Sequence, residues 1–284
     1  MNTFRNFHPL TLALYFLSVI GISIFTFNPL YLSVGFFGSV LFLITLAGLR
    51  TTLKQLRLYI IIFIIVTATN PIFSHNGATV LFFINDNRIT LEALVYGAVL
   101  GLMIVEVLVW FKCFNLVFDS ERLLYLFGKA FPKLALVVSI ALGFVPQFIR
   151  TFKSINSAQK SMNTKQGRVR RYLASFSAVI TRSMESAIVT SDSMKSRGYG
   201  LRGRTHFSRF RFTSYDAVYL FLFLLMFVCT LPALLFGHAK VQFYPYISFA
   251  NPTVSLLSFA VLAMIPSFFE VKEGLKWKYS ISKI

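Results

Sequence analysis

Residues 10–49 read LTLALYFLSVIGISIFTFNPLYLSVGFFGSVLFLITLAGL and carry no charged side chain. One crossing of a bilayer needs about 20 apolar residues, so this run is long enough for two crossings. Phe27-Asn28-Pro29, near the middle of the run, has the residue types of a turn. The stretch therefore predicts two membrane spans that fold back at this turn. The first is expected to be an uncleaved span rather than a signal peptide, because no small-residue cleavage site follows it.

Four further apolar runs continue the same pattern along the chain. They are residues 58–74, 89–111, 217–236 and 253–269. Overall, 56% of the residues are hydrophobic and only 13% are charged, whereas a soluble domain carries about 25% charged residues. The predicted fold class is an all-α integral membrane protein with about six transmembrane helices.

One more apolar stretch, residues 134–149, reads LALVVSIALGFVPQFI. Its 16 residues fall just short of the roughly 17 to 25 needed for a span, and Pro146 interrupts it. A crossing here would also place the basic residues that follow it on the outer side. We therefore expect a helix that lies beneath the membrane or packs against the spans from below.

The distribution of basic residues predicts the orientation in the membrane. With a cytosolic N-terminus, the inner segments 1–9, 50–57, 112–212 and 270–284 hold 26 of the 28 Lys and Arg residues. Inner loops are enriched in Lys and Arg, and the rule is strongest for short segments such as 50–57 and 270–284. Both termini are therefore expected in the cytosol of a multi-pass protein of the cell membrane. The expected domains are residues 1–113, 114–212 and 213–284, with spans one to four, a cytosolic domain, and the last two spans.

The cytosolic domain is expected to contain two long helices. The second runs from about residue 168 to residue 196, and its apolar residues fall within about 80° of one another at 100° per residue. These residues are Val169, Leu173, Phe176, Ile180, Met184, Ala187 and Met194. We expect the apolar first helix to cover this stripe. Gly198 follows as the glycine that ends the helix.

Arg197 at this helix end has two readings, which the residues alone leave open. It could be a cation that complements the negative end of the helix dipole. It could also be a planar group held out to dock on a carboxylate of another protein. The basic run of residues 202–212 is likewise open to two readings. Contact with anionic lipid is preferred over nucleic acid, because a span follows directly.

Three features bear on chemistry. No P-loop, HExxH or paired aspartate-rich motif is present, so the chain is not expected to be an enzyme or to bind ATP itself. Glu106 lies within the fourth span, where it is expected to pair with an inner-surface lysine or to be protonated. Gly97 and Gly101 in the same span form a GxxxG, which favours close approach of another helix.

Three stretches together resemble a known family, the transmembrane T components of energy-coupling factor (ECF) transporters. Residues 70–77, NPIFSHNG, are similar to the family's NPxFxHxG segment. Phe144-Val145-Pro146 followed by Ala158-Gln159-Lys160 is similar to its first coupling helix. Met194-Lys195-Ser196-Arg197-Gly198-Tyr199 matches the arginine-centred end of its second coupling helix. The similarity runs through nearly the whole chain in order.

The resemblance implies a function and a set of partners. In that family, two cytosolic helices cross as an X, and the end of each docks on one of two ABC-type ATPase subunits. The membrane part holds a substrate-binding S component, which releases a vitamin or metal ion inside. The chain would then lie in the lipid bilayer and would not bind nucleic acid. The partner subunits would bind the ATP, and the chain itself would bind no cofactor.

The resemblance also implies which residues dock on the ATPases. They are Ser196, Arg197 and Gly198 at the second helix end, and Ser161, Met162 and Asn163 at the first. The first end departs from the family pattern, because no arginine follows Ala158-Gln159-Lys160. Lys160, Lys165 or an apolar contact through Met162 would replace the ion pair there. The alternatives are a membrane-embedded enzyme acting on a lipid or prenyl substrate, and an S component.

Overall fold

The computed structural model describes residues 4–74, 77–84, 87–162, 167–201, 210–235, 241–244, 246, 248 and 253–281. The chain divides into two compact units. The first contains Met1–Asp119 and Phe210–Ile284, and the second contains Ser120–Arg209.

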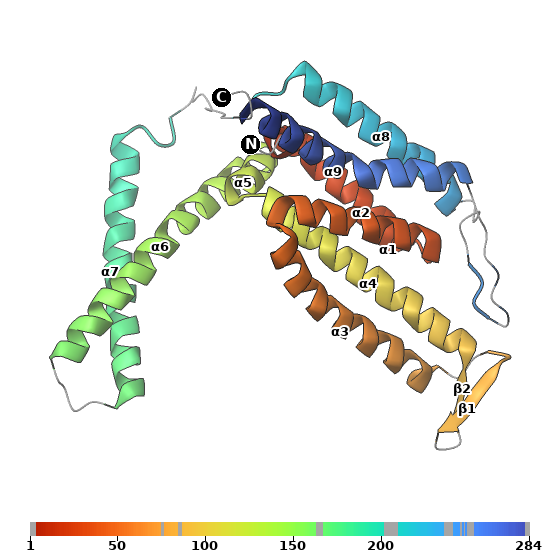
Figure 1. The fold of residues 1–284 in the computed structure, drawn as a ribbon. Coiled ribbons are helices and arrows are strands. Elements are labelled where there is room, and N and C mark those ends of the chain that lie inside the picture. The colour runs from red at the N-terminus through yellow and green to blue at the C-terminus, as the bar shows by residue number, and fades with distance from the viewer. Residues whose placement is uncertain are drawn as a thin grey trace. The chain divides into compact units, whose positions relative to one another are not determined.

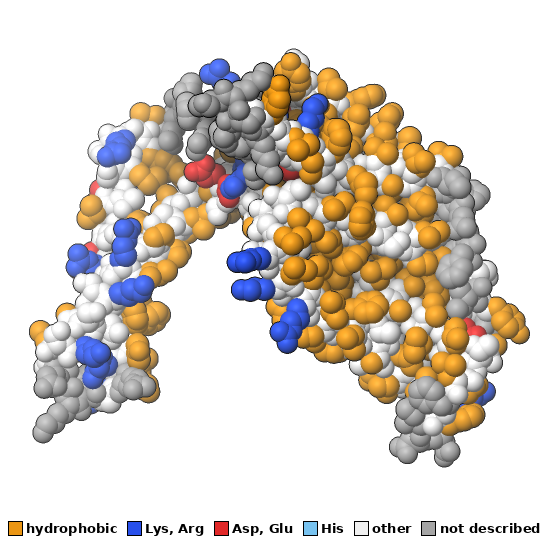
Figure 2. All heavy atoms as spheres, viewed as in Figure 1, with side chains coloured by type: hydrophobic (Ala, Val, Ile, Leu, Met, Phe, Trp, Pro, Cys, Tyr) orange, Lys and Arg blue, Asp and Glu red, His pale blue; other side chains and the backbone are white. Residues whose placement is uncertain are grey.

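The described part of the first unit is a bundle of long helices (Figure 1). They are α1 (Pro9–Phe25), α2 (Pro29–Ala47), α3 (Leu49–Phe73), α4 (Leu91–Val117), α8 (Ser214–Leu235) and α9 (Thr253–Ile281). Helix α4 packs against α1, α2 and α3, while α9 packs against α2 and α8. Apolar side chains cover most of the visible face of this unit in Figure 2. The expected all-α membrane fold is confirmed.

Proline and a short capping side chain start the first two helices. The Asn28 side chain accepts a hydrogen bond from the backbone N–H of Leu30 at 3.0 Å, and Pro29 is the first residue of α2. Proline is favoured there because the first N–H of a helix has no partner within the helix. His8 and Pro9 start α1 in the same way. The expected turn at Phe27-Asn28-Pro29 is confirmed.

Within the described residues, six helices are long and apolar enough to cross a bilayer, but one of them differs from the six expected. Helix α6 (Pro132–Ser161) is among them, whereas the 17-residue α1 is shorter than the others. Residues 134–149 were expected to be too short for a span and to be interrupted at Pro146. Both expectations were wrong, because α6 is 30 residues long and passes through Pro146. The basic residues in its second half remain the argument that it does not cross.

The core of the first unit is aromatic. Phe4, Tyr15, Phe16, Phe42 and Trp110 are each at most 1% exposed. Their rings meet edge-on or tilted, for example Phe4 on Phe42 at 5.4 Å between ring centroids. Such pairs add about 0.5 to 1.5 kcal/mol beyond the burial of their area. The cluster joins the N-terminal segment, α1, α2 and α4 into one core.

The GxxxG of α4 faces α3. A Cβ atom on Gly97 would lie 2.9 Å from the Thr67 carbonyl oxygen and 2.9 Å from Asn70 Cβ. One on Gly101 would lie 3.2 Å from the Phe63 carbonyl oxygen. These distances leave no room for a side chain, so the two glycines allow the close approach that the motif favoured.

Gly97→Ala is expected to lower the stability of the bundle by about 1 to 3 kcal/mol, because α3 must move away from the new methyl group. Thermal unfolding in detergent measures the effect. Gly21→Ala in α1 is the matched control, since nothing lies within 4 Å of the position of its Cβ atom. Equal unfolding midpoints for the two variants would contradict the close contact.

A β-hairpin between α3 and α4 was not expected. Strand β1 (Val80–Ile84) pairs antiparallel with β2 (Asn87–Thr90). The expected start of the fourth span at residue 89 was therefore wrong, because Ile89 lies in β2 and the helix begins at Leu91. Thr90 caps α4 by accepting a hydrogen bond from the backbone N–H of Ala93 at 3.3 Å.

The second unit contains α5 (Ser120–Ala130), α6 and α7 (Arg168–Ser196). Helices α6 and α7 cross in Figure 1 and contact each other. Pairs of side chains join them at the crossing. The Ser175 hydroxyl donates to Gln159 Oε1 at 2.9 Å, and the rings of Phe152 and Tyr172 stack at 6.3 Å. The unit lies within the domain expected at residues 114–212.

Candidate functional site

The end of α7 is a Schellman motif built on Gly198. The backbone N–H of Tyr199 bonds to the carbonyl of Met194 at 2.9 Å, and that of Gly198 bonds to the carbonyl of Lys195 at 2.9 Å. Gly198 has φ +81°, a conformation that side chains with a Cβ atom disfavour. The helix therefore ends sharply, and Arg197 is its C-cap residue. The sequence prediction of Gly198 as the stop is confirmed.

Arg197 is exposed at this helix end. Its guanidinium has no hydrogen-bond or ion-pair partner among the residues that the structure describes. The neighbouring Lys195 instead lies 3.9 Å from Asp192, one turn earlier on the same helix. The rigid turn therefore presents a planar cation with five unused N–H donors, which suits a carboxylate of a partner.

The end of α6 presents a different surface. Ser161 is the last helical residue, and its hydroxyl donates a hydrogen bond to the carbonyl of Ser157 at 3.1 Å. Met162 caps the helix with 76% of its side chain exposed. Asn163 and Lys165 lie outside the described residues. Lys160 and Met162, two of the three residues expected to replace the missing arginine, are both exposed.

The two helix ends are far apart along their helices. Arg197 follows Ser175, at the crossing, by 22 residues, or about 33 Å of helix at 1.5 Å per residue. Met162 comes only three residues after Gln159, at the same crossing. The described residues of the two predicted docking sets therefore lie at two separate helix ends.

The apolar stripe of α7 is not covered by the described residues of the second unit, contrary to expectation. Leu173 is 63% exposed and Met184 is 66% exposed. The crossing is made by Tyr172, Ser175 and Val179, which lie roughly 100° around the helix from the centre of the stripe. Helix α6 likewise has no buried residue. Both helices thus leave apolar faces that the rest of the described second unit does not cover.

The first of the family-like segments lies at the end of α3. Asn70 donates its side-chain N–H to the carbonyl of Ala93 at 3.2 Å, and Pro71 is buried. These residues fasten the end of α3 to the start of α4. His75 and Asn76 lie outside the described residues, as does the basic run at 202–209.

Glu106 is completely buried between helices rather than paired near a membrane surface. Its Oε1 lies 2.6 Å from the hydroxyl of Ser23 in α1, and the indole of Trp110, one turn further along α4, interacts with the same carboxyl group. The expected lysine partner was wrong, because α4 continues to Val117, about 16 Å beyond Glu106. Sequence alone gave no signal that Ser23 would be the neighbour.

Comparison with known proteins gives one relevant relative. No known family model matches the chain. The energy-coupling factor transporter transmembrane protein EcfT of Lactobacillus helveticus is 34% identical over 110 residues. These residues make up 36% of this chain and 40% of that protein, so the match spans about two fifths of the relative's length. The resemblance to an ECF transporter T component is confirmed over that part. The chain is a multi-pass membrane protein with a transporter subunit as its relative.

Proposed function

We propose that the chain is the transmembrane scaffold, the T subunit, of an ATP-driven importer of the ECF type. In this role it has no catalytic site and no cofactor of its own, and two ABC-type ATPase subunits bind the ATP. Its helices α6 and α7 pass the ATPase motion to an S component that carries a vitamin or metal ion. The N- and C-termini lie in the cytosol, as the distribution of Lys and Arg indicates.

Arg197 at the tip of α7 is the observation that carries this proposal. The glycine turn fixes its backbone, and its guanidinium is unused within the described residues. A group held in this way needs little ordering to dock, which favours affinity. The separate tip at Ser161 and Met162 provides a second docking point, so each ATPase subunit of a pair would have one. The contact there is apolar, through Met162.

The uncovered faces of α6 and α7 support the second half of the proposal. Exposed apolar faces of this extent mark contact with a protein or with lipid. In the proposed complex these faces lie against the S component, so that motion at the two tips is passed to it directly. The motion would be transmitted well because long helices are stiff.

Co-purification tests the proposal. We expect the chain, tagged and extracted in mild detergent, to bring down two ATPase subunits and a small membrane protein, all identified by mass spectrometry. Recovery of the chain with no ATPase subunit would contradict the proposal. Turnover of a lipid or prenyl substrate by the isolated chain would favour the membrane-embedded enzyme instead.

A further inference from the structure

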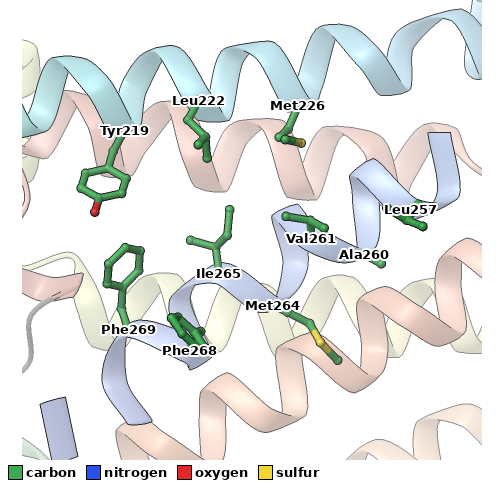
Figure 3. Close-up of a pocket in the computed structure, with 10 residues that line it drawn as sticks. All are labelled: Tyr219, Leu222, Met226, Leu257, Ala260, Val261, Met264, Ile265, Phe268 and Phe269. Carbon is green, nitrogen blue, oxygen red and sulfur yellow. The ribbon is translucent and has the colours of Figure 1, made fainter. Parts of the chain in front are cut away.

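Helices α8 and α9 leave an apolar groove between them on the surface of the first unit (Figure 3). Its volume is about 540 Å³. Tyr219, Leu222 and Met226 line it from α8, and Ala260, Ile265 and Phe269 are among its residues on α9. Tyr219 supplies the one side-chain hydroxyl in the lining. Both helices are among those able to cross a bilayer, so the groove opens toward lipid.

The groove runs along α9. Its lining residues on that helix extend from 257 to 269, or about 18 Å at 1.5 Å per residue. Helix pairs in membranes rely on small or polar residues at their contact, and Ala260 is the one small residue in the lining. A single hydrocarbon chain fits this lining better.

Two lysines continue the groove at one end. Around α9, the groove residues cover an arc of about 180°, and Lys272 and Lys276 fall within that arc one and two turns beyond Phe268. Both lysines are exposed. Neither has an ion-pair partner among the described residues. The acidic residues of this segment, Glu270 and Glu273, fall outside the arc.

Aromatic residues mark the same end as the boundary of the bilayer. The rings of Tyr219 and Phe269 meet edge-on at 5.1 Å, and Phe7 packs against both. Tyrosine is enriched where hydrocarbon meets head groups, because its ring is apolar and its hydroxyl is polar. The groove therefore has an apolar body, an aromatic rim and two cations just beyond it.

We infer that this groove binds one acyl chain of an anionic phospholipid, whose net negative head group lies against Lys272 and Lys276. The groove gives little preference among lipids by itself, because bilayer and groove are equally apolar. The preference for negative charge comes from the two lysines. Each cation near an anionic surface is worth about fivefold in binding, so the pair favours an anionic head group by about 25-fold.

Native mass spectrometry of the full chain, with any subunits that accompany it, tests the inference. The delipidated protein is titrated with dioleoyl phosphatidylglycerol and, separately, with dioleoyl phosphatidylcholine. We expect phosphatidylglycerol to bind about 25-fold more tightly. The double variant Lys272→Glu/Lys276→Glu should lose this preference. The matched control Lys54→Glu/Arg57→Glu, which reverses two cations on α3, should keep it. Equal affinities in the unaltered protein would overturn the inference.

Filling the groove tests its apolar part. Ala260→Trp, or the milder Ala260→Leu, should reduce the occupancy by both lipids at least fivefold. Ile64→Trp, at a 57% exposed position of α3, should leave the occupancy unchanged. Thermal unfolding shows which variants are folded, and the milder one serves if the larger one is not. If the Ala260 variants still bind lipid but no longer co-purify with a membrane protein, the groove is a protein interface and the inference is overturned. These outcomes do not depend on the recovery of ATPase subunits.

Discussion

Arg197→Glu is expected to abolish ATPase-driven uptake while the protein remains folded and inserted in the membrane. In the proposed complex the guanidinium meets a carboxylate, and the substitution replaces attraction by repulsion. Removing one partner of a buried charge pair at an interface weakens binding by about a hundredfold or more, and reversal costs more. The fold is unaffected because the side chain is exposed and without a partner in the described residues.

Capture of ATPase subunits by the tagged chain measures the first effect, and uptake in whole cells measures the second. Arg182→Glu is the matched control, since Arg182 is an exposed arginine on the same helix, 15 residues before the tip. Arg197→Lys should retain only part of the binding, because an ammonium group cannot form the paired hydrogen bonds of a guanidinium. Normal uptake by Arg197→Glu would show that this residue only complements the helix dipole.

The membrane part of the fold could be predicted because hydropathy and length decide it. An uncharged run such as residues 10–49 has few other structures available, and Asn28-Pro29 identifies the fold-back by its own local geometry. Helix α6 shows the limit of this reasoning. Apolar residues fit equally well against lipid and against a protein partner, so residues 134–149 do not by themselves tell which one covers them.

The candidate site was predictable where its chemistry is local. Gly198 ends α7 through hydrogen bonds within six residues, and sequence patterns record such local geometry well. The direction of the apolar stripe was not local. It depends on where α6 crosses, and Ser175 rather than the stripe residues makes that crossing. The hairpin at 80–90 was missed because two strands of five and four residues leave too short a pattern beside long apolar helices.

Glu106→Lys is expected to remove most of the folded protein, the largest stability effect that we predict. The Glu106 side chain is fully buried among α1, α2, α4 and α9, and a Cβ atom on Gly35 would overlap its carboxyl group. Lysine is longer and brings an unpaired charge, and a buried charge without a partner costs about 3 to 5 kcal/mol. That loss is comparable with the whole stability of many domains, about 5 to 15 kcal/mol.

Glu106→Gln distinguishes a requirement for shape from a requirement for charge. The Ser23 hydroxyl lies within hydrogen-bond distance of both Glu106 Oε1 and the Val19 carbonyl. Because it has one hydrogen, it can donate to only one of these two oxygens at a time. Glutamine keeps an oxygen for the first contact and adds N–H donors, so this variant should elute from size exclusion as a single folded species in near-normal yield. Glu185→Lys, an exposed acidic residue of α7, is the control for charge reversal. If Glu106→Lys were also folded in normal yield, the burial of this carboxyl group would be contradicted. If Glu106→Gln folds but uptake fails, the ionisable proton of Glu106 is needed for transport as well as its shape for packing.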